Sequence, residues 1–151
     1  MNESFEDVLA KYGELTYTNH GTSMLPMLRP ERDVFTVVRK GQDRCKENDV
    51  VLFKRDGRYV LHRIVEVQED AYTILGDNCV SYERNVKDED ILGVLVRFYR
   101  NRKVIEIDNC FYRFYVKQLR LFERPRIWLK RFFVKAKASV KDLLLKLHFK
   151  K

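Results

Sequence analysis

The sequence predicts a mainly β domain, a partly closed barrel, preceded by a short helix and followed by a basic helical tail. Three observations support this prediction: short β-rich runs separated by close turns, helical periodicity near both ends, and a change of charge near residue 110. Short strands joined by tight turns are typical of an all-β sheet or barrel rather than of βαβ units. At 151 residues the chain has room for one ordinary domain and an appendage.

The first expected element is an amphipathic helix over residues 4–12. Ser4 and Asp7 form an S-x-x-D capping signal, and Gly13 suits the position just after a helix end. One face carries the apolar residues Phe5, Val8, Leu9 and Tyr12.

The next expected elements are short strands. They cover Leu15–Thr18, Val34–Val38, Asp49–Lys54, Arg58–Val67, Ala71–Leu75, Ile91–Phe98 and Lys103–Ile107. Between two of these runs, Asp56-Gly57 is a strong hairpin signal. The strand region therefore ends close to residue 110.

From Phe111 onward the apolar spacing becomes helical. One helix is expected over 111–123, Pro125 interrupts it, and a second helix of about 24 residues is expected from Arg126. The apolar residues of the second helix recur at three- and four-residue steps: Leu129, Phe133, Ala136, Val140, Leu144 and Leu147. We therefore divide the chain into a domain at 1–110 and a helical tail at 111–151.

The charge of the chain is concentrated in the tail. Residues 111–151 contain thirteen Lys and Arg against Glu123 and Asp142, a net charge of +11, whereas residues 1–110 carry −3. Basic residues interleaved with Trp and Phe suit a helix lying on an anionic membrane. A helix packed on the domain, with its cations solvated, is the plainer alternative, and no base-reading motif favours nucleic acid.

The most informative stretch is Gly21-Thr22-Ser23-Met24-Leu25-Pro26-Met27-Leu28, between two expected strands. A serine in such a turn often bonds only its own backbone, so it does not indicate catalysis by itself. Further segments follow in order: residues 29–33 (RPERD), 48–53 (NDVVLF), 61–65 (LHRIV), 75–78 (LGDN) and 91–95 (ILGVL). Together these six segments resemble those of the type I signal peptidases, within the signal-peptidase/LexA-like superfamily of serine peptidases.

The resemblance implies a coiled β-barrel with Ser23 as nucleophile and His62 as general base. Most bacterial signal peptidases and the LexA-like autoproteases have lysine as the base, whereas the endoplasmic-reticulum type has histidine, so this chain resembles the Ser–His subclass. Histidine titrates near neutral pH without the heavy desolvation that lysine needs. A lone histidine on a strand is usually structural, and the upstream serine motif gives His62 its catalytic interpretation.

The residue that orients His62 is left open between two carboxylates. An imidazole base works best when a carboxylate fixes its tautomer. Asp77 lies in the GDN turn, where it could instead brace the backbone. Glu83 stands six residues further on, where the resemblance places the partner acid of the histidine-type enzymes.

The oxyanion hole is where the sequence departs from the family pattern. Many members have a hydroxyl two residues before the nucleophile, and here that residue is Gly21. The Ser23 N–H remains available and Thr22 could add its hydroxyl, while Met24 shapes and anchors the loop. The departure keeps a second interpretation open, a catalytically weak or inactive peptide-binding module docked at a membrane.

We expect a serine endopeptidase acting on a peptide or preprotein, and the resemblance implies small residues just before the scissile bond. No cofactor or metal is expected, because Cys45, Cys79 and Cys110 form no C-x-x-C pattern. Cys79 lacks any nucleophile motif. The acidic N-terminus has no secretory signal, and no apolar run approaches the ~20 residues that span a bilayer. The expected location is therefore the cytoplasm, with possible attachment to the inner membrane surface.

Overall fold

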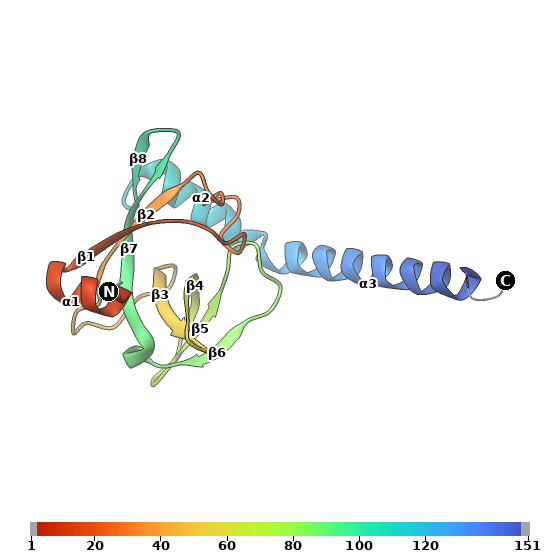
Figure 1. Cartoon of the computed structure of the whole chain (residues 1–151), viewed down its shortest axis with the longest axis horizontal. Coiled ribbons are helices and arrows are strands. Elements are labelled where there is room, and N and C mark those ends of the chain that lie inside the picture. Colours follow the sequence, from red (N-terminus) through yellow and green to blue (C-terminus); the bar gives the residue numbers. More distant parts are fainter. Residues whose placement is uncertain (1–2, 149–151) are drawn as a thin grey trace. The chain divides into compact units, whose positions relative to one another are not determined.

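The computed structural model describes the backbone of residues 3–148 and the side chains of residues 3–137. The elements in chain order are α1 (Phe5–Tyr12), β1 (Glu14–Thr18), β2 (Val34–Arg39), β3 (Val50–Arg55), β4 (Arg58–Val67), β5 (Tyr72–Leu75), β6 (Glu83–Val86), the 3₁₀ turn η1 (Asp88–Asp90), β7 (Ile91–Arg100), β8 (Lys103–Glu106), α2 (Cys110–Leu121) and α3 (Glu123–His148). The prediction of a mainly β fold with a helix before it and helices after it is confirmed (Figure 1).

The strands of this region form one antiparallel sheet in the order β1-β2-β7-β3-β4-β5-β6, with β8 paired to β7. Across residues 3–148, β1 and β6 end this path and do not pair with each other, so the sheet is not a closed barrel. The physical reason lies partly in β6, which pairs with β5 at only two positions and contains Asn85 in a left-handed conformation. Such a short, irregular strand is poorly suited to close a barrel.

The helix and hairpin signals in the sequence correspond to real local structure. Ser4 and Asp7 form a reciprocal capping box at the start of α1. Asp56 and Gly57 both have positive φ, as a two-residue type I′ hairpin requires, and they join β3 to β4. Every expected strand is present within a few residues of its predicted limits, whereas β6 was not predicted because its sequence, ERNV, buries only Val86.

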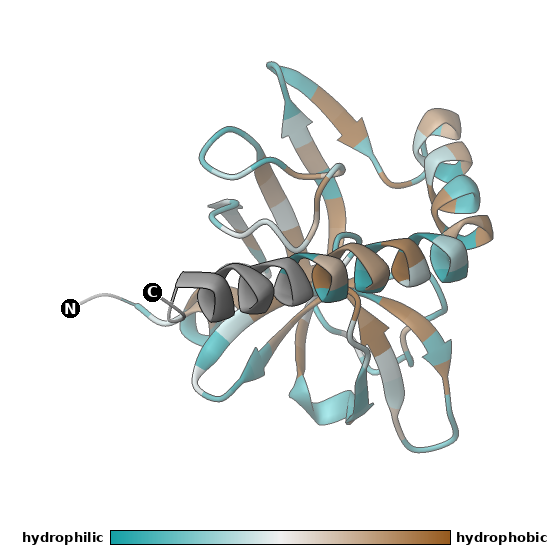
Figure 2. Ribbon diagram, turned by 90° about the vertical axis from the view of Figure 1, so that its right-hand side faces the viewer, coloured by the Kyte–Doolittle hydropathy of each residue, from teal (hydrophilic) through white to brown (hydrophobic). Residues whose placement is uncertain are grey.

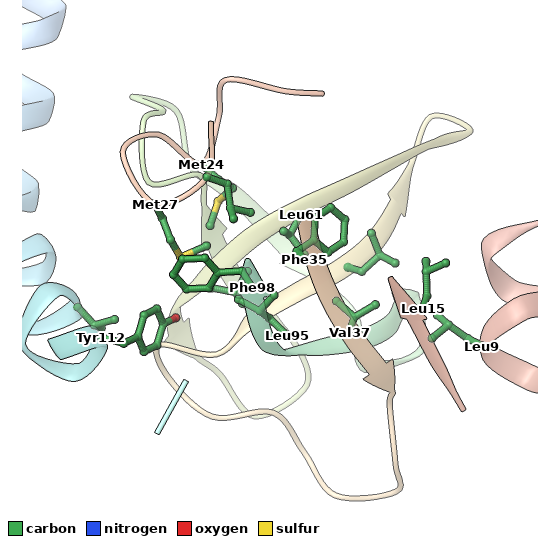
Figure 3. Packing of buried hydrophobic residues seen from close by; sticks show 14 residues of the cluster. Leu9, Leu15, Met24, Met27, Phe35, Val37, Leu61, Leu95, Phe98 and Tyr112 are labelled. Atoms are coloured by element: carbon green, nitrogen blue, oxygen red, sulfur yellow. The ribbon is translucent and has the colours of Figure 1, made fainter. Parts of the chain in front are cut away.

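A large cluster of buried apolar side chains packs against the sheet and includes residues of the loop that follows β1. Met24, Met27 and Leu28 are almost fully buried in this cluster. Figure 3 shows Met24 and Met27 beside Phe98 of β7. Burying a methionine or leucine side chain contributes about 1.5–3 kcal/mol, so these three anchors hold the Ser23 loop against the core.

The chain divides into two compact units after Val116, six residues later than the sequence predicted. The shift arises because Tyr112 and Val116 of α2 are buried in the large apolar cluster of the first unit. Helix α3 starts just after α2 ends and has Pro125 in its first turn, as expected. Val140, Leu144 and Leu147 lie outside the residues whose side chains are described. Among the described helices, none is both long and apolar enough to cross a bilayer.

Candidate active site

The first unit contains a surface cleft of about 850 Å³ that brings distant parts of the sequence together. Ser23, His62 and Glu83 all line it, although they come from the β1–β2 loop, from β4 and from β6. Aromatic side chains, including Tyr17 and Tyr59, form part of its wall. The cleft is large enough for several residues of an extended peptide.

Hydrogen bonds at both ends hold the Ser23 loop in one conformation. The Asn19 side chain donates to the Gly21 carbonyl over 2.8 Å. At the other end, buried Asp33 accepts from the Arg29 N–H at 2.9 Å and from the Arg32 guanidinium. Burial alone would raise the pKa of Asp33, but these hydrogen bonds lower it below its usual value. Hydrogen bonds at both ends of the loop restrict the backbone positions that Ser23 can adopt.

His62 lies in the buried middle of β4, opposite Val51 of β3, with its ring at the cleft. Its Nδ1 is 2.6 Å from Oε1 of Glu83, and the other oxygen of Glu83 is 2.7 Å from Nη1 of Arg55. The Nδ1 contact is close but not aligned as a hydrogen bond. Because a carboxylate only accepts, Glu83 favours the tautomer with the proton on Nδ1, which leaves the lone pair on Nε2, 4.0 Å from Cys79 Sγ.

Burial and the neighbouring charges of His62 together favour its neutral ring. Burial lowers the pKa of His62 below its ordinary 6.5, Glu83 opposes this only in part, and Arg55 lowers it further. A neutral imidazole at pH 7 is the form that accepts a proton from a hydroxyl.

Three chemically relevant atoms gather around the α-carbon of Gly76. A Cβ built on this glycine would lie 2.7 Å from Cys79 Sγ, 2.8 Å from His62 Nε2 and 2.9 Å from the Ser23 carbonyl oxygen. Only glycine fits such a position. The Ser23 carbonyl and Nε2 of His62 therefore approach the same point of the turn. Among the described residues, no hydrogen bond joins Ser23 Oγ to His62.

The turn after β5 also braces the Ser23 loop directly. The Asn78 N–H donates to the Ser23 carbonyl over 2.6 Å, and its side-chain amide donates to the Thr22 carbonyl over 3.1 Å. Among residues 3–137 the Ser23 N–H donates no hydrogen bond, a condition that an oxyanion donor must meet.

The other oxyanion candidates behave differently. Thr22 is exposed and does not line the cleft, and Met24 is buried in the core, where it anchors the loop. Gly21 lines the cleft, and a Cβ there would meet only Ser23 Oγ, at 3.9 Å. The position that many signal peptidases fill with a hydroxyl is thus open in this chain.

Asp77 lies in a separate cluster. Both of its oxygens are 2.8 Å from the Arg63 guanidinium, and the Tyr115 hydroxyl donates to it over 2.9 Å. Arg63 also donates to the Tyr112 hydroxyl, so the cluster ties α2 to the sheet. Successive residues of a strand point to opposite faces, which separates Arg63 from His62. Of the two carboxylates considered from the sequence, Glu83 is the one that contacts His62.

Of three further residues of the site, one carried no recognisable signal in the sequence and two lay in a segment with a recognisable motif. Arg55 ends a strand as any exposed cation could, and its contact with Glu83 depends on the fold. Asn78 and Gly76 lie in the LGDN segment, whose match to the signal-peptidase turn marked their position but not their contacts with the Ser23 loop.

No protein-family model matches the chain, and no curated protein is significantly similar to it. The functional argument therefore rests on the residues and geometry of the cleft.

Proposed function

We propose that this protein is a serine endopeptidase of the signal-peptidase type that cleaves a peptide or preprotein. The observation that carries the proposal is the arrangement of His62, which has Glu83 on Nδ1 and presents Nε2 toward the Ser23 loop within one cleft. A base oriented by a carboxylate beside a serine is the arrangement that activates a hydroxyl nucleophile. The mainly antiparallel β fold is compatible with the signal-peptidase/LexA-like architecture that the six sequence segments suggest.

In the proposed reaction, Ser23 Oγ attacks the scissile carbonyl carbon while His62 Nε2 takes the hydroxyl proton. The Ser23 N–H binds the resulting oxyanion. Collapse of the tetrahedral intermediate breaks the C–N bond, and His62 gives its proton to the leaving amine. Water then attacks the acyl-enzyme with His62 again as base, which releases the carboxylate product and restores Ser23.

A second candidate nucleophile has one observation in its favour. Cys79 Sγ lies 4.0 Å from His62 Nε2, so a thiol–imidazole pair could form at the same base. We prefer Ser23 because its unbonded N–H supplies an oxyanion donor and its loop is anchored at both ends. Cys79 lies in the turn that contacts this loop.

An inactive peptide-binding module is the remaining interpretation, and the missing hydroxyl at Gly21 is its support. A single oxyanion donor would make catalysis slower by ~10²–10³-fold, by the usual cost of removing one donor. The His62–Glu83–Arg55 arrangement favours catalysis, since peptide binding alone needs no carboxylate beside an imidazole.

Cleavage of a mixed peptide library, with new termini identified by mass spectrometry, tests these candidates together. We expect products with wild type and with Cys79→Ala, and none with Ser23→Ala or His62→Ala. Products that disappear only in Cys79→Ala and His62→Ala would replace Ser23 by the cysteine. Peptide binding without products in any form, even after long incubation, would overturn the enzyme proposal in favour of the binding module.

A further inference from the structure

Helix α3 presents a surface of exposed aromatic side chains that the proposed peptidase chemistry does not use. Two-thirds of the Trp128 surface and more than half of the Phe132 surface are exposed. The two rings stack with their centroids 6.0 Å apart. Phe133 packs edge-on against Phe132, and more than half of its surface is exposed. Nearly half of the Leu129 surface is exposed as well. Figure 2 shows hydrophobic residues, in brown, among hydrophilic ones along the described part of α3.

Four exposed apolar residues of α3 form a continuous arc around the helix, while Ile127 and Val134 lie on the opposite side. At about 100° per residue, the positions of Trp128, Phe132, Leu129 and Phe133 cover an arc of about 140°. This is the width expected of a helix face that contacts an apolar phase along its length.

Cations border this arc on both sides. Lys135, Arg131 and Arg124 follow one edge of the helix, and Arg126, Lys137 and Lys130 follow the other, by the same 100° geometry. Between residues 124 and 137 there are six cations and no carboxylate. The long stems of Lys and Arg let their charges reach outward while their methylenes extend the apolar arc.

We infer that α3 binds the surface of an anionic phospholipid membrane, with the Trp128–Phe132–Phe133–Leu129 arc inserted among the acyl chains. The arrangement fits this partner because an apolar arc between two cationic rows matches a layer with apolar chains below anionic headgroups. A nucleic acid would be matched by the cations but not by an unbroken aromatic and aliphatic arc, since phosphate contacts require no such face. This inference is independent of Ser23 and His62.

Trp128 allows a direct test because it is the only tryptophan in the chain. Full-length protein is mixed with vesicles of phosphatidylcholine alone or of phosphatidylcholine with phosphatidylglycerol, and binding is followed by vesicle flotation and by Trp128 emission. We expect the protein to float with the anionic vesicles, with a blue shift of the emission, and at least tenfold weaker binding to the neutral ones. Added salt should weaken binding.

Two double variants separate the contributions of charge and apolar contact. Arg131→Gln with Lys135→Gln should weaken flotation with anionic vesicles about tenfold or more, given the usual contribution of each cation near such a surface. Trp128→Ser with Phe132→Ser should weaken it at least as much, since two large apolar side chains are lost. The matched controls, Lys46→Gln with Lys103→Gln and Tyr12→Ser with Val104→Ser, alter exposed residues of the first unit and should bind as wild type.

Several results would overturn the inference. Equal binding to neutral and anionic vesicles would remove the role of the cations, and equal weakening by the control variants would remove the role of α3. Absence of vesicle binding, together with capture of a labelled RNA or DNA duplex at the same ionic strength, would assign the basic surface to nucleic acid instead.

Discussion

Two neighbouring residues of β4, His62 and Arg63, each contact a carboxylate, and the difference between the two pairs separates chemistry from structure. Arg63 and Asp77 are both 1% exposed in their side chains, and they share further hydrogen bonds with Tyr112 and Tyr115. The two side chains are buried and each is hydrogen-bonded to the other, which suits a structural cross-link. His62 and Glu83 lie at the cleft, with side chains 6% and 18% exposed, and the imidazole can change its protonation.

The alternation of a β-strand produces this division. Because His62 and Arg63 are adjacent in β4, their side chains leave the strand on opposite faces. One face opens to the cleft and the other packs against α2. Asp77 and Glu83 therefore contact different residues because His62 and Arg63 lie on opposite faces of β4. The number of residues between a carboxylate and His62 in the sequence does not predict which of them makes the contact.

The largest expected effect comes from Glu83→Gln. If Glu83 fixes the His62 tautomer, this nearly isosteric change should lower kcat about 10³–10⁴-fold, the scale seen when the orienting acid of a triad becomes an amide. Stability should change little because Arg55, the other partner of Glu83, is half exposed. Peptide cleavage rates and urea denaturation measure the two effects, and a fully active Glu83→Gln protein would refute the proposed role.

Asp77→Asn should have the opposite profile. The change leaves the Arg63 charge buried without its counter-ion, so the free energy of unfolding should fall by about 3–5 kcal/mol. Urea denaturation measures this loss, and replacing the pair together, by Arg63→Met with Asp77→Leu, should recover part of it. A stable Asp77→Asn protein with a defective His62 would mean that the two carboxylates have been assigned the wrong way round.

Gly21→Ser sharpens the assignment of the cleft as a catalytic site. A Cβ at residue 21 would meet only Ser23 Oγ, at ordinary contact distance, so the backbone there has room for a small side chain. If the cleft stabilises an oxyanion, the added donor should raise kcat about tenfold, a modest share of what an oxyanion donor can contribute. Gly21→Ala supplies the matched control without a hydroxyl. An equal effect of serine and alanine would argue against the oxyanion explanation.

The smallest expected effect is a shift in pH dependence. Because burial holds the pKa of His62 below 6.5, kcat/KM should rise with pH through a midpoint below 6.5 and be level at neutral pH. Arg55→Gln removes a cation that lowers this pKa and should move the midpoint to higher pH. Arg58→Gln, at an exposed cation of the same cleft, is the control. An unchanged midpoint in Arg55→Gln would exclude electrostatic contact with His62.

The same pKa predicts how stability depends on pH. The folded state disfavours protonated His62, whereas the unfolded chain binds the proton with an ordinary pKa of 6.5. The contribution of neutral His62 is therefore present above pH 6.5 and is lost as the pH falls below it. His62→Gln should weaken this acid dependence in denaturant titrations followed by circular dichroism.

Much of this arrangement could be predicted from the sequence, because the relevant signals are local. Ser4, Asp7, Asp56 and Gly57 determine a helix start and a hairpin through contacts with near neighbours. The strand that contains His62 was predicted with its true limits. The carboxylate that contacts His62 was not decided by the sequence, because both Asp77 and Glu83 remained candidates.

The remainder depends on packing between distant segments. Strand β6 has little apolar signal, and its position is set by pairing with β5. The contact of Arg55 with Glu83, the approach of Gly76 to Ser23 and the burial of Tyr112 each join residues far apart in the chain. The openness of the sheet likewise follows from edge strands that fail to pair, which the run of strands alone did not predict.

The most direct test of the central claim is to locate the adduct formed by a fluorophosphonate probe. The protein is incubated with the probe at neutral pH, digested and mapped by mass spectrometry, alongside Ser23→Ala and His62→Ala. The account predicts a phosphonyl group on Ser23 in wild type, with no labelling of Ser23→Ala and almost none of His62→Ala. Equal labelling of all three proteins, or an adduct at any residue other than Ser23, would contradict it.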